Sequence, residues 1–326
     1  MSFISVLFAL LIEQARPLGP GNRVHAMLRA WVRWSVRNFD AGKSVHGWLT
    51  WAFAVGAPSM ASLAIYWLLD LTLGWAFALL WSVAVLYVTL GFRQFSFHFT
   101  QIRDALAEGD EALARDLLAT WQHIDARELP HSEIVRDVIE HSVIAAHRHV
   151  FGVLAWFSVL AAFGFGPAGA VLYRASEFVA RYWLHDSKTH HQPVSQAIQQ
   201  TARLAWRWID WMPARITAIS FAVVGSFEEA MDGWRQHERQ SDGDNDALIL
   251  AATAGAVNIR LGDGRPPVNK AEDSAPVEPA AASIAGHTMG QTPELAHMAV
   301  IVGLVWRTVV MWILLLALLT LARLLG

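Results

Sequence analysis

The sequence contains no cysteine and has few charged residues, which make up 16% of its 326 positions. The lack of cysteine excludes disulfides, thiolate nucleophiles and cysteine-bound zinc or iron–sulfur clusters. The net charge of −3 gives no sign of nucleic-acid binding, for which a basic balance is typical. The GxxxxGK[ST] phosphate loop and the GxSxG nucleophile motif are also missing. Several common enzyme classes are thereby excluded, and the hydrophobic pattern becomes the main signal.

Long uncharged runs dominate the chain. No charged residue occurs at 48–69 or at 71–90, and two further apolar runs lie at 149–173 and 298–322, the last interrupted by Arg307. A helix of about 20 apolar residues spans the hydrocarbon core of a bilayer. The pattern predicts an all-α, polytopic integral membrane protein with about 4–5 hydrophobic helices. Amphipathic helices on the cytoplasmic side or at the interface would connect them, and the lipid bilayer is the first expected partner.

Glycine, proline and aspartate predict where the helices end. Asp70 and Gly74 would mark the turn of a helical hairpin over 48–90, and Asp110 would cap a short helix that follows Gly109. The stretch GFGPAG at 164–169 should bend or end a helix. Proline removes a helical hydrogen bond, so Pro213 should separate a polar helical region from a short apolar segment at 211–225.

Charge and composition predict how the chain is organised. Residues 14–47 are rich in arginine, which favours the cytoplasmic side, and 22–37 are amphipathic enough to lie on the inner leaflet. We expect a helical membrane domain at 1–264 and a disordered linker at 265–293, which is rich in proline, alanine, serine and glycine. A C-terminal transmembrane helix would occupy 294–326. The apolar N-terminus lacks the features of a secretory signal and should form a half-buried or interfacial helix.

Histidines are numerous, but their spacing predicts no metal site. His147 and His149 point about 160° apart on a helix, and His141 lies about 12 Å along the axis from His149. A zinc site on one helix normally uses histidines four residues apart. The 16 tryptophans are typical of membrane interfaces, where the indole ring lies in lipid and its N–H group contacts water.

The stretch IDWMPARIT at 209–217 places Asp210 and Arg215 just before the apolar run AISFAVVG. Two interpretations are open. Both side chains could reach the membrane surface with no role beyond anchoring. Alternatively, they could form a charge pair or bind an anion, because the arginine fork matches phosphate and carboxylate groups.

Four motifs, in order, make the chain resemble the CobD/CbiB family of cobalamin-biosynthesis membrane proteins. IDWMPARIT is similar to the family's Pro-Ala-Arg-x-Thr segment. The other three are ALAEGDEALAR at 105–115, GPAGAVLYRASEFVARYW at 166–183 and SDGDNDALILAATAGAVNIRLGDG at 241–264. The resemblance implies a bacterial inner-membrane, multi-pass protein. It would join an aminopropanol compound, or its phosphate, to the corrinoid adenosylcobyric acid, using ATP and Mg²⁺ in an amide-forming ligase reaction.

The resemblance also implies a ligand site. Its members would be Arg215, which would bind a phosphate or carboxylate, together with Asp210, Thr217, Asp110, Arg115 and Arg260. No metal ligands and no catalytic residues are assigned.

The sequence lacks several polar residues that the family carries at corresponding positions. HIDARELP stands in place of a Gly-Arg-Asp-Thr tetrad, and Glu140 alone matches a Glu-Asn…Asp pattern. An AmpE-like branch of membrane regulators linked to cell-wall status shares these departures. Two hypotheses follow: a cobalamin-biosynthesis protein with a degenerate ligase site, or a non-catalytic AmpE-like regulator. The sequence leaves open whether the protein is an enzyme.

Overall fold

The computed structural model describes residues 2–16, 23–40, 42–122, 124–189, 194–240, 243–262 and 290–325. Helices account for nearly all of this described part, and its isolated β-bridge joins Ile259 to Gln291. Three continuous helical stretches are long and apolar enough to cross a membrane: Ser44–Leu73, His131–Ala162 and Leu295–Ala322. Shorter apolar helices cover Phe3–Ala15, Trp75–Thr89 and Asn245–Val257. The prediction of an all-α membrane protein is confirmed.

The chain folds into two units, and each unit combines distant segments. The first unit comprises residues 1–94, 148–213 and 312–326, and the second comprises 95–147 and 214–311. The first contains α1 (Ser2–Ala15), α2 (Arg23–Phe39), α3 (Ser44–Leu73), α4 (Trp75–Thr89), α8 (Gly152–Ala162) and α9 (Ala168–Thr189). The second contains α6 (Glu111–Gln122), α7 (His131–Ala146), α11 (Phe227–Gln240) and α12 (Asn245–Val257). The boundaries fall at or within α5 (Phe92–Ala107), the π-helix η1 (His147–Phe151), α10 (Gln196–Val224) and α13 (Leu295–Leu325).

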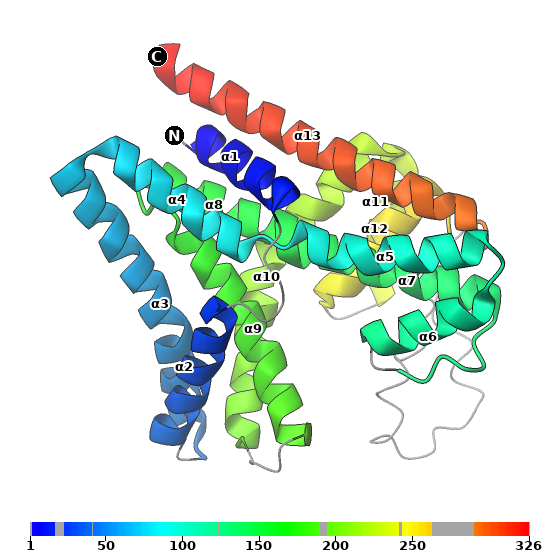
Figure 1. Ribbon diagram of the computed structural model, residues 1–326, viewed down its shortest axis with the longest axis horizontal. Helices are drawn as coiled ribbons and strands as arrows, with labels where there is room; N and C mark the ends of the chain where they lie inside the picture. The colour runs from blue at the N-terminus through cyan, green and yellow to red at the C-terminus, as the bar shows by residue number, and fades with distance from the viewer. Residues whose placement is uncertain are drawn as a thin grey trace. The chain divides into compact units, whose positions relative to one another are not determined.

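Helices α3 and α4 form the predicted hairpin, but the second arm is shorter than expected (Figure 1). Gly74, at φ 91°, lies between them in a conformation that favours glycine. The first residues of the expected run at 71–90 belong to α3, so α4 retains only 15 residues. At about 1.5 Å per residue it measures roughly 22 Å, less than the hydrocarbon thickness of about 30 Å.

The core of the first unit forms where α2, α3, α9 and α10 meet. Val32 of α2, Val55 of α3, Val179 and Trp183 of α9, and Ile198 of α10 are all buried in one cluster. The basic helix α2 runs beside α3 (Figure 1). Its apolar residues Leu28, Trp31 and Val36 pack against this cluster. Trp183 is thus a core residue and does not have the interfacial position that is typical of tryptophans in membrane proteins.

In the second unit, α11 and α12 pack closely because small residues face each other. A Cβ atom on Gly255 would lie 2.2 Å from the carbonyl oxygen of Glu229, and one on Gly233 would lie 2.6 Å from that of Ala251. Asp244 caps α12 by accepting from the backbone N–H groups of Asp246 and Ala247. Of the predicted disordered linker at 265–293, residues 265–289 lie outside the described part of the chain.

Candidate functional site

The motif IDWMPARIT lies inside one continuous helix, α10, which contains Pro213. The predicted separation at this proline is therefore wrong. Proline lacks an N–H group, so the carbonyl of Ile209, four residues earlier, loses its helical donor. The indole Nε1–H of Trp156, on α8, donates to that carbonyl at 2.9 Å. A side chain from another helix satisfies the carbonyl that proline leaves, and α10 continues.

Asp210 is fully buried in the first unit. Its Oδ1 atom accepts a hydrogen bond of 2.8 Å from the Tyr173 hydroxyl on α9. Burial raises the pKa of Tyr173, and the carboxylate of Asp210 raises it further, so the phenol stays protonated and donates. The Tyr173 ring lies against Gly152, where an added Cβ would lie 2.1 Å from the ring carbon Cζ. Asp210 is thus held inside the protein, and the interpretation that it reaches the membrane surface is not needed.

Thr217 belongs to the second unit, where its hydroxyl lies 2.9 Å from Nδ1 of His147. Both side chains are buried. His147 is the first residue of η1, and π-helical segments of this kind occur often at functional sites. The spacing of the histidines had predicted that His147 is not a metal ligand. No local signal in the sequence could pair it with a threonine 70 positions away.

Arg215 lies on the part of α10 that belongs to the second unit. Its side chain is 21% exposed, and Nη2 lies 3.9 Å from the half-exposed carboxylate of Glu238 on α11. Partial burial lowers the pKa of Arg215, and Glu238 raises it. A guanidinium stays protonated in proteins, so Arg215 is a fixed positive charge with part of its surface accessible.

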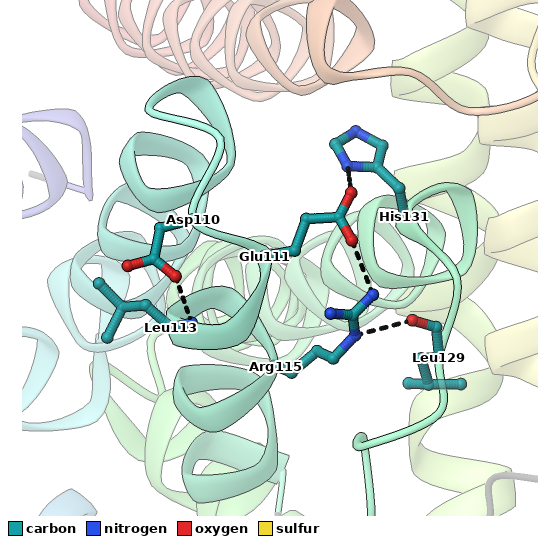
Figure 2. A network of polar contacts seen from close by, with 6 residues as sticks. All are labelled: Asp110, Glu111, Leu113, Arg115, Leu129 and His131. Carbon is teal, nitrogen blue, oxygen red and sulfur yellow. Dashed lines mark hydrogen bonds and ion pairs between the residues drawn. The ribbon is translucent and has the colours of Figure 1, made fainter.

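Asp110 and Arg115 form a network around the start of α6 (Figure 2). Asp110 accepts from the N–H group of Leu113 at 2.9 Å, as predicted for a cap. Arg115 binds Glu111 at 2.7 Å and the carbonyl oxygen of Leu129 at 3.0 Å. His131, at the start of α7, lies 3.2 Å from Glu111. The network ties α6 to the connection that leads into α7.

Arg260 lies in the NIRLGDG segment, beside a strand-like pairing. Its Nε atom donates to the carbonyl oxygen of Gly290 at 2.9 Å, and its backbone N–H group donates to Gln291 at the same distance. Close by in sequence, the N–H group of Gly262 donates to Glu140 of α7 at 2.8 Å. Glu140, the residue that matches the family's glutamate, thus holds another family-like segment.

The predicted site residues are therefore distributed over two units. Asp210 belongs to the first unit, whereas Asp110, Arg115, Arg215, Thr217 and Arg260 belong to the second. The three arginines of this set contact different groups. Arg115 pairs with Glu111, Arg215 lies near Glu238, and Arg260 donates to the carbonyl of Gly290. Among the described residues, no group of three or more histidine, aspartate or glutamate side chains could hold a metal ion.

Comparison with known proteins assigns the sequence to a family. The model of the CobD/Cbib protein family matches residues 6–296. The chain belongs to the CobD/CbiB family. A cobalamin biosynthesis protein CobD of Stutzerimonas stutzeri is 28% identical over 323 residues, covering 96% of each chain.

Other relatives with the same name match over shorter lengths. The protein from Chromobacterium violaceum is 32% identical over 182 residues, which span 56% of this chain and 55% of that protein, about half its length. One from Leptospira interrogans is 28% identical over 197 residues, or 58% of this chain and 59% of that protein. No solved structure gives a significant match.

Proposed function

We propose that the protein acts in cobalamin biosynthesis as a multi-pass protein of the bacterial inner membrane. It would join an aminopropanol compound, or its phosphate, to adenosylcobyric acid through an amide bond, with ATP and Mg²⁺. One observation carries the proposal: the CobD/CbiB family match covers residues 6–296 and includes all the motif segments. A relative named for cobalamin biosynthesis that aligns over 96% of both chains supports it.

Arg215 is the residue proposed to bind an anionic group of the substrates. The corrinoid carboxylate, the aminopropanol phosphate and ATP are all anions, and an arginine fork can bind such oxygens with two parallel hydrogen bonds. Its partial exposure supports this role, because a ligand could reach the guanidinium. Thr217, two residues further on, would hold α10 against His147 so that Arg215 keeps its direction.

A second candidate function is a non-catalytic AmpE-like membrane regulator. It is supported by the loss of the family's Gly-Arg-Asp-Thr tetrad, which HIDARELP replaces in this sequence. There the carbonyl of Leu129 binds Arg115, so both groups serve the connection between α6 and α7 (Figure 2). In this case the arginines would be structural, and the ligase chemistry would be lost.

Complementation tests the proposal. The chain would be expressed in a bacterium that lacks its own CobD/CbiB protein and is supplied with cobyric acid, and cobalamin-dependent growth would be scored. Arg215→Ala should abolish growth. Arg235→Ala is the matched control, because Arg235 is an arginine of α11 whose side chain is 65% exposed and pairs with Asp232.

Two outcomes would decide between the functions. Growth with the wild-type chain and the control, but not with Arg215→Ala, would support the ligase. Absence of growth from a protein shown by immunoblot to be inserted in the membrane would contradict the ligase and favour the regulator.

A further inference from the structure

Helix α2 has two faces of opposite character, and its apolar face packs inside the protein. Val32 belongs to the core cluster of the first unit, and Leu28, Trp31 and Val36 pack against that cluster. The amphipathic pattern had predicted that this helix lies on the inner leaflet, where its apolar face would enter the lipid. Because the structure uses the apolar face for protein packing, the opposite face of α2 is the one turned to the surroundings.

This opposite face is basic. Arg23, Arg33 and Arg37 are all exposed. At 3.6 residues per turn the three arginines lie within about 80° of one another around the helix axis. The helix contains no aspartate or glutamate. Asp40, which follows it, accepts hydrogen bonds from the backbone N–H groups of Gly42 and Ser195. The charge of this face is therefore not balanced from within α2.

The spacing of the arginines along α2 is unfavourable for an isolated helix. Arg29, Arg33 and Arg37 follow one another at intervals of four residues. Like charges four residues apart lie one turn above each other and destabilise a helix. An anionic surface beside the helix would offset this repulsion, which indicates a negatively charged binding partner.

Two exposed apolar side chains border the arginines. Met27 is 76% exposed and Trp34 is 42% exposed. The Trp34 ring stacks on Trp31 with 5.4 Å between the ring centroids, and it lies 5.9 Å from the ring of Phe53 on α3. These contacts hold Trp34 in place while part of its ring stays accessible. Arginine beside tryptophan and methionine is typical of helix faces at the headgroup level of a membrane. We call Arg23, Met27, Arg33, Trp34 and Arg37 together the outer face of α2.

The first turns of α3 lie beside this helix. The indole N–H group of Trp31 donates at 3.1 Å to the carbonyl of Ala54, ten residues after α3 begins at Ser44 (Figure 1). With 30 residues, α3 measures about 45 Å, roughly 15 Å more than the hydrocarbon core of a bilayer. Charge is costly inside hydrocarbon, so the end of α3 that carries α2 is the end that extends into the headgroup layer. Trp48, 45% exposed, suits the same level.

We propose that the outer face of α2 binds the headgroups of anionic phospholipids. The guanidinium groups donate hydrogen bonds to the lipid phosphates, and Trp34 and Met27 contact the upper part of the acyl chains. A lipid fits better than a soluble acidic protein, because α2 ends at Phe39 and the membrane-crossing α3 begins at Ser44. The inference goes beyond the proposed function, since it requires no corrinoid and no ligase chemistry.

A fluorescent label on the outer face tests its position. The chain has no cysteine, so Met27→Cys provides a single labelling site in the full-length protein. A bimane dye is attached there, and the protein is placed in nanodiscs that contain phosphatidylglycerol. A lipid with a spin label on its headgroup should quench the dye, and iodide in the water should quench it less than it quenches the same dye on free cysteine. Full quenching by iodide with none by the labelled lipid would overturn the proposal and favour a soluble partner.

The choice of lipid is measured by native mass spectrometry of the full-length protein, released from a neutral detergent with phosphatidylglycerol or phosphatidylcholine. Each cation near an anionic membrane surface strengthens attachment about fivefold, so the double variant Arg33→Gln with Arg37→Gln should bind phosphatidylglycerol about 25-fold more weakly. Its binding of phosphatidylcholine should not change. Arg33→Lys with Arg37→Lys keeps both charges and should stay within about twofold of the wild type. Arg235→Gln is the control, because Arg235 is an exposed arginine of α11.

Loss of the preference for phosphatidylglycerol in the glutamine pair, with its retention in the lysine pair and in the control, supports the proposal. Equal binding of the two lipids by the wild type would overturn it. An unchanged affinity of the glutamine pair would also overturn it, because the arginines would then make no contribution. An equal loss in the lysine pair or in the control would contradict a role for charge on this face.

Discussion

The indole N–H group of Trp156 donates to the carbonyl of Ile209, the one that Pro213 leaves without a helical donor. The same relationship occurs in α3. There Trp31 donates at 3.1 Å to the carbonyl of Ala54, four residues before Pro58. In both helices a tryptophan from a neighbouring helix replaces the N–H group that proline lacks. Each proline can therefore lie within a long helix without a buried unsatisfied carbonyl.

Replacing Trp156 by phenylalanine should destabilise the protein through this carbonyl. We expect a loss of about 1–3 kcal/mol in the free energy of unfolding, because a buried acceptor loses its donor. Denaturant unfolding in detergent measures it. In a Pro213→Ala background the alanine N–H group can bond Ile209, so Trp156→Phe should cost clearly less. Trp208→Phe, at a position on α10 that is 74% exposed, should have little effect. Equal costs in the two backgrounds would contradict the explanation.

Gly152→Ala should displace Tyr173 and disturb its bond with Asp210. A Cβ atom at this position would overlap the ring, and such overpacking typically costs about 1–3 kcal/mol. Gly56→Ala is the matched control, because Gly56 also lies within a helix but has nothing within 4 Å of the added atom. That variant should be neutral or slightly stabilising, by about 0.5–1 kcal/mol. A comparison of unfolding temperatures checks both, and an equal response of the two glycines would disprove the proposed contact.

Glu177→Gln should remove a pH-dependent part of the stability. The pKa of Glu177 is lowered from 4.5 to about 2 by Arg174, Arg181 and their neighbours, against the effect of burial. A depressed carboxylate pKa stabilises the folded state above the unfolded pKa, and this contribution disappears as the pH falls from about 4.5 towards 2. The contribution is at most about 3 kcal/mol.

The measurement is the difference in unfolding free energy between wild type and Glu177→Gln from pH 7 down to the acid limit of the native protein. The difference should be constant at neutral pH and should shrink below about pH 4.5. Glu108→Gln, at an exposed position, serves as the control for loss of a carboxylate at the surface. A difference that does not change with pH would argue against an ionised Glu177.

Thr217→Val should weaken the link between α10 and His147 while leaving the shape of the side chain nearly unchanged. The loss of the 2.9 Å hydrogen bond should cost about 1–2 kcal/mol. If Thr217 directs Arg215, cobalamin-dependent growth should also fall. Thr308→Val is the comparison, because the hydroxyl of Thr308 is buried and bonds to the carbonyl of Leu304 in its own helix. Similar losses for both threonines would show that the His147 contact has no special value.

Local chemistry made the helix ends predictable. Glycine tolerates positive φ, which explains why Gly74 and Gly109 lie at breaks between helices. Asp110 caps its helix because its carboxylate can accept from the N–H group of a residue three positions later. The long apolar runs require burial or lipid contact, so the all-α membrane character could be predicted from the sequence. The family motifs could be recognised directly from their residues. The motif alone was enough to propose Asp210, Arg215 and Thr217 as candidate site residues, which stay a prediction.

Only the tertiary structure decided which groups these residues meet. Pro213 was expected to break α10, but Trp156, 53 positions before Ile209, satisfies the Ile209 carbonyl that the proline leaves without a donor. Tyr173 and His147 lie 37 and 70 positions from Asp210 and Thr217, and no periodicity links residues at such separations. Helix propensity and capping act within a few residues, whereas the partner of a buried polar group depends on which helices pack together.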